Sequence, residues 1–158
     1  MLLLTKDCIY IVKDRYGFRP LCLTQTPNSL CVMSENIAYP ESNLLREIEP
    51  GEIVKITSYN SFETLYKYNK QTEHKFCIFE NIYFMNPRTI RYDTSVKDFR
   101  ENLGSLLANQ ETIQFTNEYI VVGVPRSGIF SGKSYAQTLN LPYEQFILKN
   151  ENVNRSFI

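Results

Sequence analysis

The sequence predicts an α+β protein, and three observations point to this class. Short apolar segments separated by turn residues make up residues 1–74. Apolar positions at helical spacing appear only after residue 95, and a continuous apolar run at residues 119–124 predicts a buried parallel strand. Strands followed by a helix–strand–helix unit are typical of an α+β fold or of two small domains. We therefore place a boundary near residue 74, with one domain at 1–74 and another at 75–158.

The expected strands of the first domain alternate with turns. Lys13, Asp14 and Gly17 supply turn chemistry, and glycine can take the positive φ that such turns need. Residues 62–68 show the alternation that is typical of antiparallel strands with one packed face. The apolar residues 1–4 are expected to begin a buried strand. The other expected strands are residues 8–12, 20–23, 30–33 and 52–56.

Two helices are expected in the second domain. Ser95 is placed to cap the first helix, and Asp98 favours its positive N-terminal end. A second helix is expected at about residues 131–139, and Asn140 suits the left-handed backbone at its exit. The positions expected to form the buried face of the first helix are Val96, Phe99, Leu103 and Leu106.

The composition excludes several classes of function. Of 158 residues, 43% are hydrophobic and 22% are charged, which indicates a folded protein. Basic and acidic residues each number 17, so the chain lacks the positive charge expected of a protein that wraps nucleic acid or coats an anionic membrane. Lys6 and Asp7 interrupt the apolar N-terminus too early for a membrane span. We expect no nucleic acid and no membrane among its partners.

The four cysteines form no Cys-x-x-Cys pair, and three lie in apolar runs. Such cysteines behave as small hydrophobic residues, which predicts reduced thiols in a cytoplasmic protein. The single histidine, His74, has no second histidine with which to share a metal. It is expected to be a solvated loop residue.

The chemistry that the sequence indicates lies in residues 121–134, Val-Val-Gly-Val-Pro-Arg-Ser-Gly-Ile-Phe-Ser-Gly-Lys-Ser. A buried strand that ends in a Ser/Gly loop before a helix directs several backbone N–H groups at one point, which favours an anion. Gly128 and Gly132 would let a phosphate approach the backbone, and the Ser127 hydroxyl would serve phosphate or Mg²⁺. An ordinary turn between a strand and a helix is the alternative interpretation.

A P-loop nucleotide site is a second hypothesis for the same segment. Ser127, Gly132, Lys133 and Ser134 nearly fit the pattern Gly-x-x-x-x-Gly-Lys-Ser/Thr. The pattern fails at its first position, where Ser127 stands instead of glycine. We also find no apolar strand ending in aspartate to serve as the Mg²⁺ partner.

Several short motifs occur in an order and spacing that hold from near residue 8 to the end of the chain. Residues 14–21 follow Asp-x-x-Gly-Phe-Arg-Pro-Leu, and residues 34–38 follow Ser-Glu-x-x-Ala. Further motifs lie at residues 45–52, 77–87, 100–108, 124–128, 135–136, 141–143 and 149–158. Together they resemble the amidophosphoribosyltransferase family. Its members make 5-phosphoribosylamine from glutamine and phosphoribosyl pyrophosphate (PRPP) in purine biosynthesis.

The resemblance implies a fold and a binding site. Residues 1–74 would be the C-terminal part of an Ntn-type glutaminase domain, with a partial antiparallel layer. Residues 75–158 would form the first α/β units of a type I phosphoribosyltransferase domain. In that family the loop matching residues 124–128 binds the pyrophosphate of PRPP, and the segment matching 149–158 folds over it. The expected pyrophosphate-binding residues are Ser127, Gly128, Lys149, Asn150, Arg155 and Ser156, with Ser127 also contributing to Mg²⁺ binding.

Some positions depart from the family pattern. Arg126 stands where the family usually has an acidic residue, and Asn154 replaces a glycine. Glu151 replaces an arginine and would bring negative charge near a polyanionic ligand. We therefore expect a weak Mg²⁺–PRPP site.

The family's catalytic groups have no match in this chain. None of Cys8, Cys22 or Cys31 falls at the position of the N-terminal cysteine nucleophile, and the Val-Asp-Asp-Ser segment that grips ribose would follow Ile158. We therefore expect no catalytic residue, and an incomplete chain that is inactive alone. Cys77 matches a cluster ligand of some relatives, but an iron–sulfur cluster needs four ligands and none is expected here.

The resemblance also implies partners. A chain that corresponds to parts of two domains leaves strand edges and apolar faces uncovered, which favours association. Besides PRPP, we expect complementary protein chains or a homo-oligomer. A non-catalytic interaction subunit is the third hypothesis.

Overall fold

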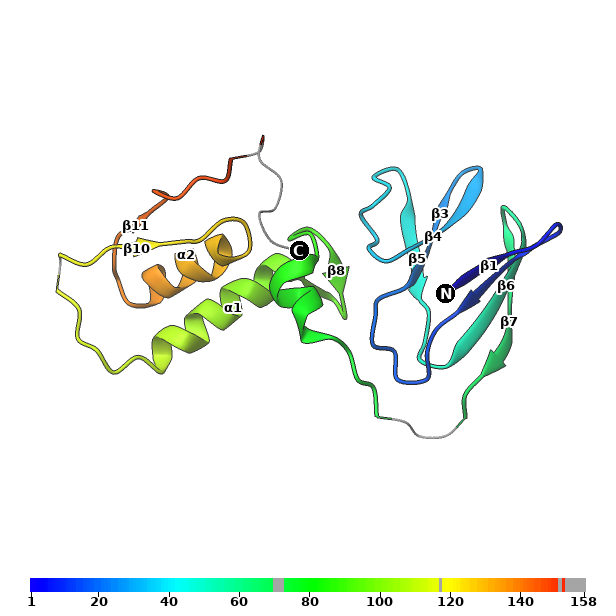
Figure 1. Ribbon diagram of the computed structural model, residues 1–158, viewed down its shortest axis with the longest axis horizontal. Helices are drawn as coiled ribbons and strands as arrows, with labels where there is room; N and C mark the ends of the chain where they lie inside the picture. Colours follow the sequence, from blue (N-terminus) through cyan, green and yellow to red (C-terminus); the bar gives the residue numbers. More distant parts are fainter. Residues whose placement is uncertain (70–72, 117, 151, 153–158) are drawn as a thin grey trace. The chain divides into compact units, whose positions relative to one another are not determined.

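The computed structural model describes the whole chain except residues 70–72, 117, 151 and 153–158. It divides into two compact units (Figure 1). Unit 1 comprises Met1–Glu80 and Phe84–Ile90, and unit 2 comprises Asn81–Tyr83 and Arg91–Ile158. The chain therefore passes between the units within residues 80–91, after the boundary expected near residue 74. The mixture of sheets and helices confirms the α+β class.

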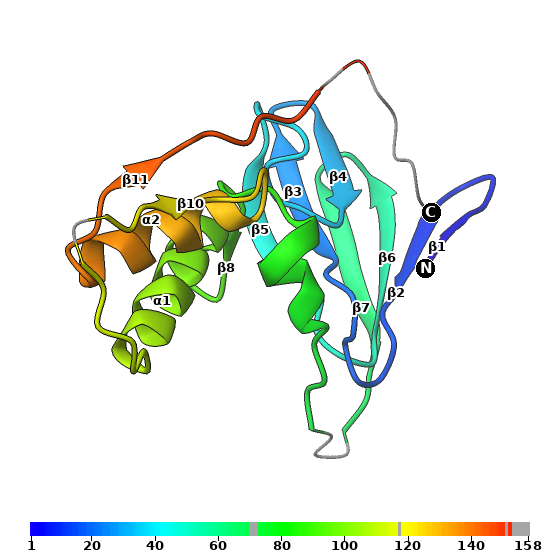
Figure 2. The ribbon, with the colours of Figure 1, turned by 60° about the vertical axis from the view of Figure 1, so that its left-hand side comes forward.

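Unit 1 holds two antiparallel sheets, with strand orders β1-β2-β6-β7 and β4-β3-β5 (Figure 2). Every strand expected from the sequence is present, and β5 is added to them. The bounds are Leu2–Leu4 for β1, Ile9–Val12 for β2, Cys22–Thr26 for β3, Ser29–Met33 for β4, Asn43–Glu47 for β5, Glu52–Ser58 for β6 and Ser61–Lys67 for β7.

The core of unit 1 lies on alternate positions of its strands. In β6, Glu52, Val54 and Ile56 are buried while the residues between them are half-buried, as the side-chain period of a strand requires. Their apolar members join other buried side chains in one cluster. The members of that cluster are Ile11, Leu23, Ile48, Val54 and Ile56.

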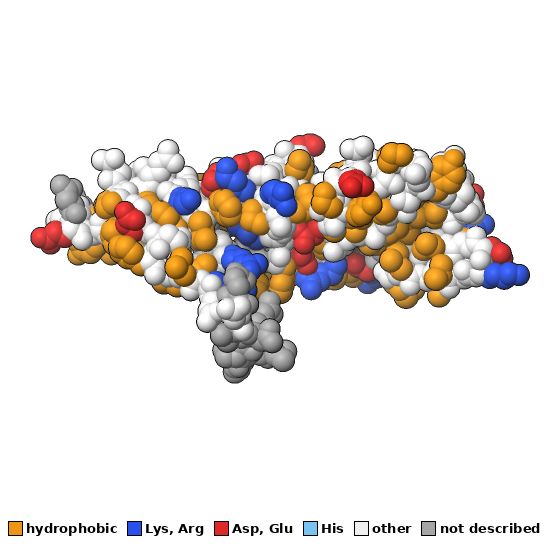
Figure 3. Space-filling model, turned by 90° about the horizontal axis from the view of Figure 1, so that it is seen from above, with side chains coloured by type: hydrophobic (Ala, Val, Ile, Leu, Met, Phe, Trp, Pro, Cys, Tyr) orange, Lys and Arg blue, Asp and Glu red, His pale blue; other side chains and the backbone are white. Residues whose placement is uncertain are grey.

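The expectation that residues 1–4 begin a buried strand is wrong in one respect. β1 forms and pairs antiparallel with β2, with Leu3 opposite Tyr10. All three of its leucines are nevertheless exposed, because strand side chains project from the two faces of a sheet and neither face of β1 is covered by the described residues. Exposed hydrophobic side chains also appear elsewhere on the surface (Figure 3).

The turn after β2 forms as the sequence predicts. The Asp14 carboxylate accepts hydrogen bonds from the backbone N–H groups of Tyr16 and Gly17 at 2.9 Å and of Phe18 at 3.1 Å. Gly17 has φ +69°, a left-handed conformation that favours glycine. The three N–H groups have no sheet partner in this turn, and the carboxylate supplies their hydrogen-bond acceptor instead.

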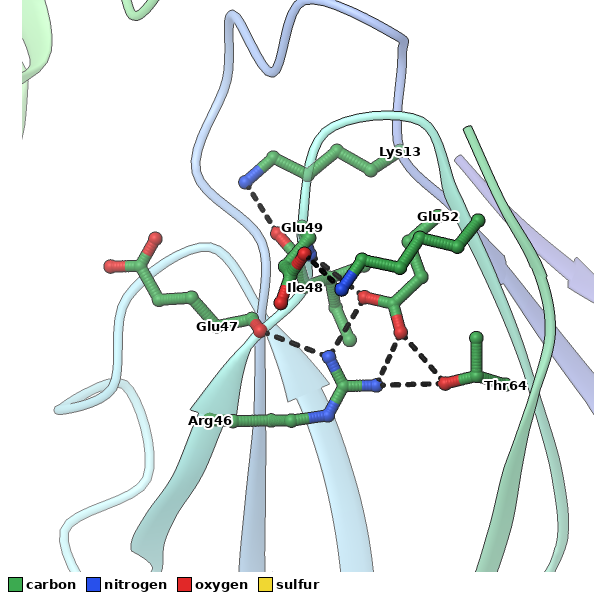
Figure 4. A network of polar contacts seen from close by, with 8 residues as sticks. Lys13, Arg46, Glu47, Ile48, Glu49, Glu52 and Thr64 are labelled. Atoms are coloured by element: carbon green, nitrogen blue, oxygen red, sulfur yellow. Dashed lines mark hydrogen bonds and ion pairs between the residues drawn. The ribbon is translucent and has the colours of Figure 1, made fainter. Parts of the chain in front are cut away.

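An ion pair between the half-buried Arg46 and the buried Glu52 joins β5 to β6 (Figure 4). Arg46 Nη1 and Nη2 donate to the two carboxylate oxygens of Glu52 at 2.8 and 2.7 Å. The Thr64 hydroxyl and the Glu49 backbone N–H each donate to the same carboxylate at 2.8 Å. The Glu52 side chain is 4% exposed, so its charge depends on these four donors in place of water.

The pKa of Glu52 follows from this environment. Burial raises it, but hydrogen bonds from Arg46, the Glu49 backbone and Thr64 outweigh burial and lower the pKa below its ordinary 4.5. The carboxylate is therefore ionised in the folded protein at neutral pH.

Unit 2 contains two helices and short strand pairs. β10 pairs with β11 in parallel, with Val121 opposite Tyr143. A π-helical turn at Glu80–Phe84 precedes β8, at the passage between the units. The remaining bounds are Ile90–Arg91 for β8, Thr94–Ser95 for β9, Val96–Asn109 for α1, Val121–Val122 for β10, Gly128–Thr138 for α2 and Tyr143–Glu144 for β11.

The cap of α1 is confirmed, but its expected buried face is only partly correct, since Phe99 and Leu103 are half-buried. The Ser95 hydroxyl accepts a hydrogen bond from the Asp98 N–H at 3.0 Å. Of the four predicted positions only Val96 is fully buried, and Leu106 is 58% exposed. The buried stripe is instead Val96, Arg100, Gly104 and Ala108. The small residues of this stripe, Gly104 and Ala108, let α2 approach closely. A larger side chain at the same place would hold α2 away.

No helix among the described residues is both long enough and apolar enough to cross a membrane.

Replacement of Arg46 by alanine is expected to destabilise unit 1 by about 3 kcal/mol, because it leaves the Glu52 charge buried without its main partner. Amide hydrogen exchange of β2 and β6 measures this loss. The control is Lys55→Ala, which removes an ion pair of 3.6 Å to the exposed Glu63 and should cost less than about 1 kcal/mol. Equal losses in the two variants would contradict the role given to Arg46.

The lowered pKa of Glu52 predicts how stability depends on pH. Because the folded pKa lies below the unfolded value of 4.5, its contribution is complete above pH 4.5 and is lost as pH falls through the folded pKa. Exchange-derived stability of β6 should therefore fall below pH 4.5, and less steeply in Glu52→Gln than in the unaltered chain. Parallel curves would contradict this assignment.

Candidate functional site

The candidate site lies between β10 and α2. The chain leaves the parallel strand at Gly123, turns through Val124, Pro125 and Arg126, and enters α2 at Gly128. The Gly128 N–H donates to the Val124 carbonyl at 2.9 Å, which closes the turn. The peptide bond between Pro125 and Arg126 is cis. This is the strand–loop–helix arrangement that the sequence predicts.

Ser127 occupies the N-cap position of α2. Its backbone is helical, with φ −69° and ψ −33°, and among the described residues its side chain makes no capping hydrogen bond. An N-cap serine normally uses its hydroxyl to satisfy an N–H group of the first turn. The Gly128 N–H already bonds to Val124, but the Ser127 hydroxyl and the positive end of the helix remain suited to an anion and its metal.

Of the two glycines predicted to admit phosphate, only Gly128 has the space. A Cβ built on Gly128 meets nothing closer than the Val124 side chain, at 3.7 Å. A Cβ on Gly132 would lie 3.3 Å from both Gly123 Cα and the Tyr143 ring. Gly132 thus serves the packing of α2 against β10 and β11, and the expectation for it is wrong.

The P-loop hypothesis is also wrong. It requires the helix to begin near Gly132, so that the N–H groups of the loop before it surround phosphates. α2 begins four residues earlier, at Gly128, which places Lys133 and Ser134 in the interior of the helix. The Ser134 hydroxyl donates to the Glu101 carbonyl of α1 at 2.6 Å, away from any helix start.

The packing of α1 against α2 holds the site in place. A Cβ on Gly104 would overlap the Ser131 backbone carbonyl, so the two helices touch through their backbones. The Ser131 hydroxyl donates to the Arg100 carbonyl at 2.8 Å. The Ser105 and Ser134 hydroxyls lie 2.6 Å apart. Small residues at the crossing set how α2 lies against α1, and with it the position of Ser127.

The end of α1 is tied to α2 by a tyrosine. The Tyr135 hydroxyl donates to Glu111 Oε2 at 2.7 Å. This bond, followed by those from the Ile113 and Thr112 N–H groups, lowers the pKa of Glu111. The same contact with Glu111 raises the pKa of Tyr135. The sequence alone offered no signal for this pair, because its members lie 24 residues apart.

The remaining predicted ligands lie in the C-terminal segment. Lys149 and Asn150 are exposed. The Asn150 side-chain carbonyl accepts a hydrogen bond from the Asn152 N–H at 3.0 Å. Arg155 and Ser156, like Glu151 and Asn154, lie outside the described residues. The structure therefore provides four of the six predicted positions: Ser127, Gly128, Lys149 and Asn150.

The described residues include no group of three or more His, Cys, Asp or Glu side chains that could hold a metal. Mg²⁺ in phosphate sites is commonly held by the phosphates, water and one or two protein oxygens. A single hydroxyl at Ser127 fits that requirement. The residues present therefore suit a metal that arrives with its phosphate ligand.

An apolar cavity of about 310 Å³ opens between α1, β10 and α2. Its lining includes Leu103, Leu107, Val121 and Tyr135. This surface suits aliphatic side chains and offers little to a polyanion. We therefore assign it to packing and keep the phosphate site at the start of α2.

The fold and this site define a class: an α/β unit in which the start of the helix after a parallel strand is suited to an anionic group. Comparison with known proteins shows what the chain is similar to. No family model matches the chain. Curated relatives named amidophosphoribosyltransferase do match it. The chain is 31% identical to the chloroplastic protein of Glycine max, covering 100% of the chain and 27% of the relative.

Relatives from other kingdoms match to the same degree. The protein of Archaeoglobus fulgidus is 32% identical over 100% of the chain and 34% of its own length. A solved structure titled as the glutamine PRPP amidotransferase of B. subtilis with ADP and GMP superposes with TM-score 0.85 at 31% identity. It matches 99% of this chain and 34% of that one. Over its full length, the chain is homologous to amidophosphoribosyltransferases, and it spans about a third of their length.

Gly104→Ala is expected to destabilise unit 2 by about 3 kcal/mol, because its Cβ would overlap the Ser131 backbone. Gly128→Ala is the matched control and should change stability by less than about 1 kcal/mol, since its Cβ has room. Urea unfolding followed by the helical circular dichroism signal measures both. Tolerance of alanine at Gly104 would contradict the backbone contact between the helices.

Proposed function

We propose that the chain forms part of an amidophosphoribosyltransferase of purine nucleotide biosynthesis, which converts PRPP and glutamine to 5-phosphoribosylamine. The observation that carries this proposal is the match of the whole chain, in sequence and in fold, to proteins of that name. The strand–loop–helix site adds a local reason, because it suits the pyrophosphate group of PRPP. In this proposal unit 1 belongs to the glutaminase-like domain, and unit 2 to the type I phosphoribosyltransferase domain.

Each expected ligand has a role in the proposed site. The Ser127 hydroxyl would bind a phosphate oxygen or Mg²⁺, and Gly128 would let the phosphate approach the start of α2. Lys149 would add positive charge and Asn150 an amide, with Arg155 and Ser156 completing the set. Mg²⁺, when bound with PRPP, neutralises charge on the pyrophosphate. The nucleotides ADP and GMP named with the B. subtilis enzyme suggest that nucleotides also bind the complete protein.

The proposal makes this chain a contributor to catalysis and not the complete catalyst. Its cysteines match no nucleophile position, and the paired aspartates of the family have no match in it. The working protein would act in the cytoplasm, where complementary protein chains would supply the missing groups; a homo-oligomer would cover exposed apolar surface but add no new catalytic group. An interaction subunit that binds neither PRPP nor Mg²⁺ is the alternative.

Ser127→Ala is expected to weaken binding of Mg²⁺–PRPP about tenfold, since it removes a hydrogen bond to a charged group. Isothermal titration of the purified chain measures the dissociation constant. Ser58→Ala, an exposed serine of β6, is the control and should bind like the unaltered chain. Lys133→Ala should also leave affinity almost unchanged, because Lys133 lies within α2.

Two outcomes would contradict the proposal. Absence of PRPP binding by the unaltered chain and by its assembly with partner chains would favour the interaction subunit. Protection by ATP that is lost in Lys133→Ala would restore the nucleotide-binding hypothesis.

A further inference from the structure

Gln145 makes three hydrogen bonds that use both donors and the acceptor of its side-chain amide. Nε2 donates to the Gly123 carbonyl at 2.8 Å and to the Ile147 carbonyl at 2.8 Å. Oε1 accepts a hydrogen bond from the Tyr143 hydroxyl. Gln145 is half-buried one residue beyond β11. Among natural side chains, only glutamine and the shorter asparagine offer two N–H donors and an acceptor in one plane.

The two carbonyls that Gln145 joins belong to the two segments of the proposed site. Gly123 is the buried residue at which β10 passes into the loop that leads to Ser127 and Gly128. Ile147 lies two residues before Lys149. Two carbonyl oxygens cannot bond to each other, so the shared Gln145 donor adds a connection between these segments beyond the pairing of β10 with β11.

Tyr143 fixes the orientation of the amide. It lies on β11 opposite Val121 of β10, and its hydroxyl occupies the space beside Gly123, where a Cβ would lie 2.5 Å from it. Because this hydroxyl donates to Oε1, the amide presents its NH₂ group to the two carbonyls. The position of Gln145 is thus set by the sheet and not by the ligand.

From this geometry we propose that Gln145 is a positioning residue that connects the β10–α2 loop to the segment carrying Lys149 and Asn150. The proposal rests on the proposed PRPP site, since it names the device that holds the two halves of that site in register. It assigns Gln145 no contact with the ligand. Protein groups that are held in place before binding lose less conformational freedom when the ligand binds. The Gln145 amide therefore raises the affinity for pyrophosphate without contacting it.

The test uses Gln145→Leu, which keeps the size of the side chain and removes the amide, and Gln145→Glu, which replaces its donors by an acceptor. Gln137→Leu is the matched control, on an exposed position of α2. The amides of Val124 and Leu148 report directly, because each shares a peptide plane with a carbonyl that Gln145 holds. Their ¹⁵N order parameters should fall from about 0.85 to below about 0.6 in both Gln145 variants.

Amides in the middle of α1 should keep their order parameters, which separates loss of the connection from loss of folding. Affinity for Mg²⁺ with inorganic pyrophosphate, measured on the same samples, should fall about tenfold in the Gln145 variants and stay unchanged in the control. If the order parameter of either the Val124 or the Leu148 amide stays high in the Gln145 variants, the proposal is overturned. If both order parameters fall but the affinity for Mg²⁺ with pyrophosphate is unchanged, the proposal is also overturned.

The proposed function and this inference fail in different ways. If neither the unaltered chain nor its assembly with partner chains binds pyrophosphate, the proposed function fails, and the role of Gln145 in ligand binding fails with it. If the unaltered chain binds pyrophosphate and the Gln145 variants keep both order and affinity, only the inference fails.

Discussion

The contact between α1 and α2 at Gly104 is the constraint on which the candidate site depends. No side chain separates the two helix backbones there, because a Cβ on Gly104 would overlap the Ser131 carbonyl. The Ser131 and Ser134 hydroxyls of α2 donate to the Arg100 and Glu101 carbonyls of α1. The position of α2 then follows, and with it the point at which the loop from β10 presents Ser127. The site therefore depends on small residues that allow the backbones of α1 and α2 to come into contact.

Unit 1 depends on a different kind of interaction. Arg46 and Glu52 meet through two hydrogen bonds, and Thr64 and the Glu49 backbone complete the coordination of the carboxylate. A buried pair of this kind adds less stability than an apolar pair of the same size, but it tolerates few alternative arrangements. We interpret it as a determinant of how the strand β5 connects to β6, alongside the apolar cluster that supplies most of the burial.

Local patterns predicted local structure well. The strands of unit 1, the left-handed conformations of Gly17 and Asn140, and the Ser95 cap all follow from signals within a few residues. The strand–loop–helix order around Ser127 was also readable, because an apolar run followed by a Ser/Gly turn has few other interpretations.

The errors have a common physical origin, since each concerns what covers a segment. Periodicity placed Leu106 of α1 in a buried face, but Gly104 and its neighbours form the contact with α2. The apolar β1 suggested burial, yet a strand at the edge of a sheet is buried only if another element covers it. Gly132 resembled a phosphate-binding glycine, and only the structure shows Gly123 and Tyr143 packed against it. Such contacts join distant residues and leave no local signal.

The central claim is that a pyrophosphate group binds where the loop after β10 meets α2, with the segment at Lys149 beside it. Titration of ¹⁵N-labelled chain with Mg²⁺–PRPP, followed by backbone amide chemical shifts, tests this most directly. We predict that the largest chemical-shift changes fall on the amides of Ser127, Gly128 and Ile129 and on those of Lys149 and Asn150. The chemical shifts of the unit 1 amides should stay unchanged. Changes centred on Gly132 and Lys133, or on unit 1, would contradict it.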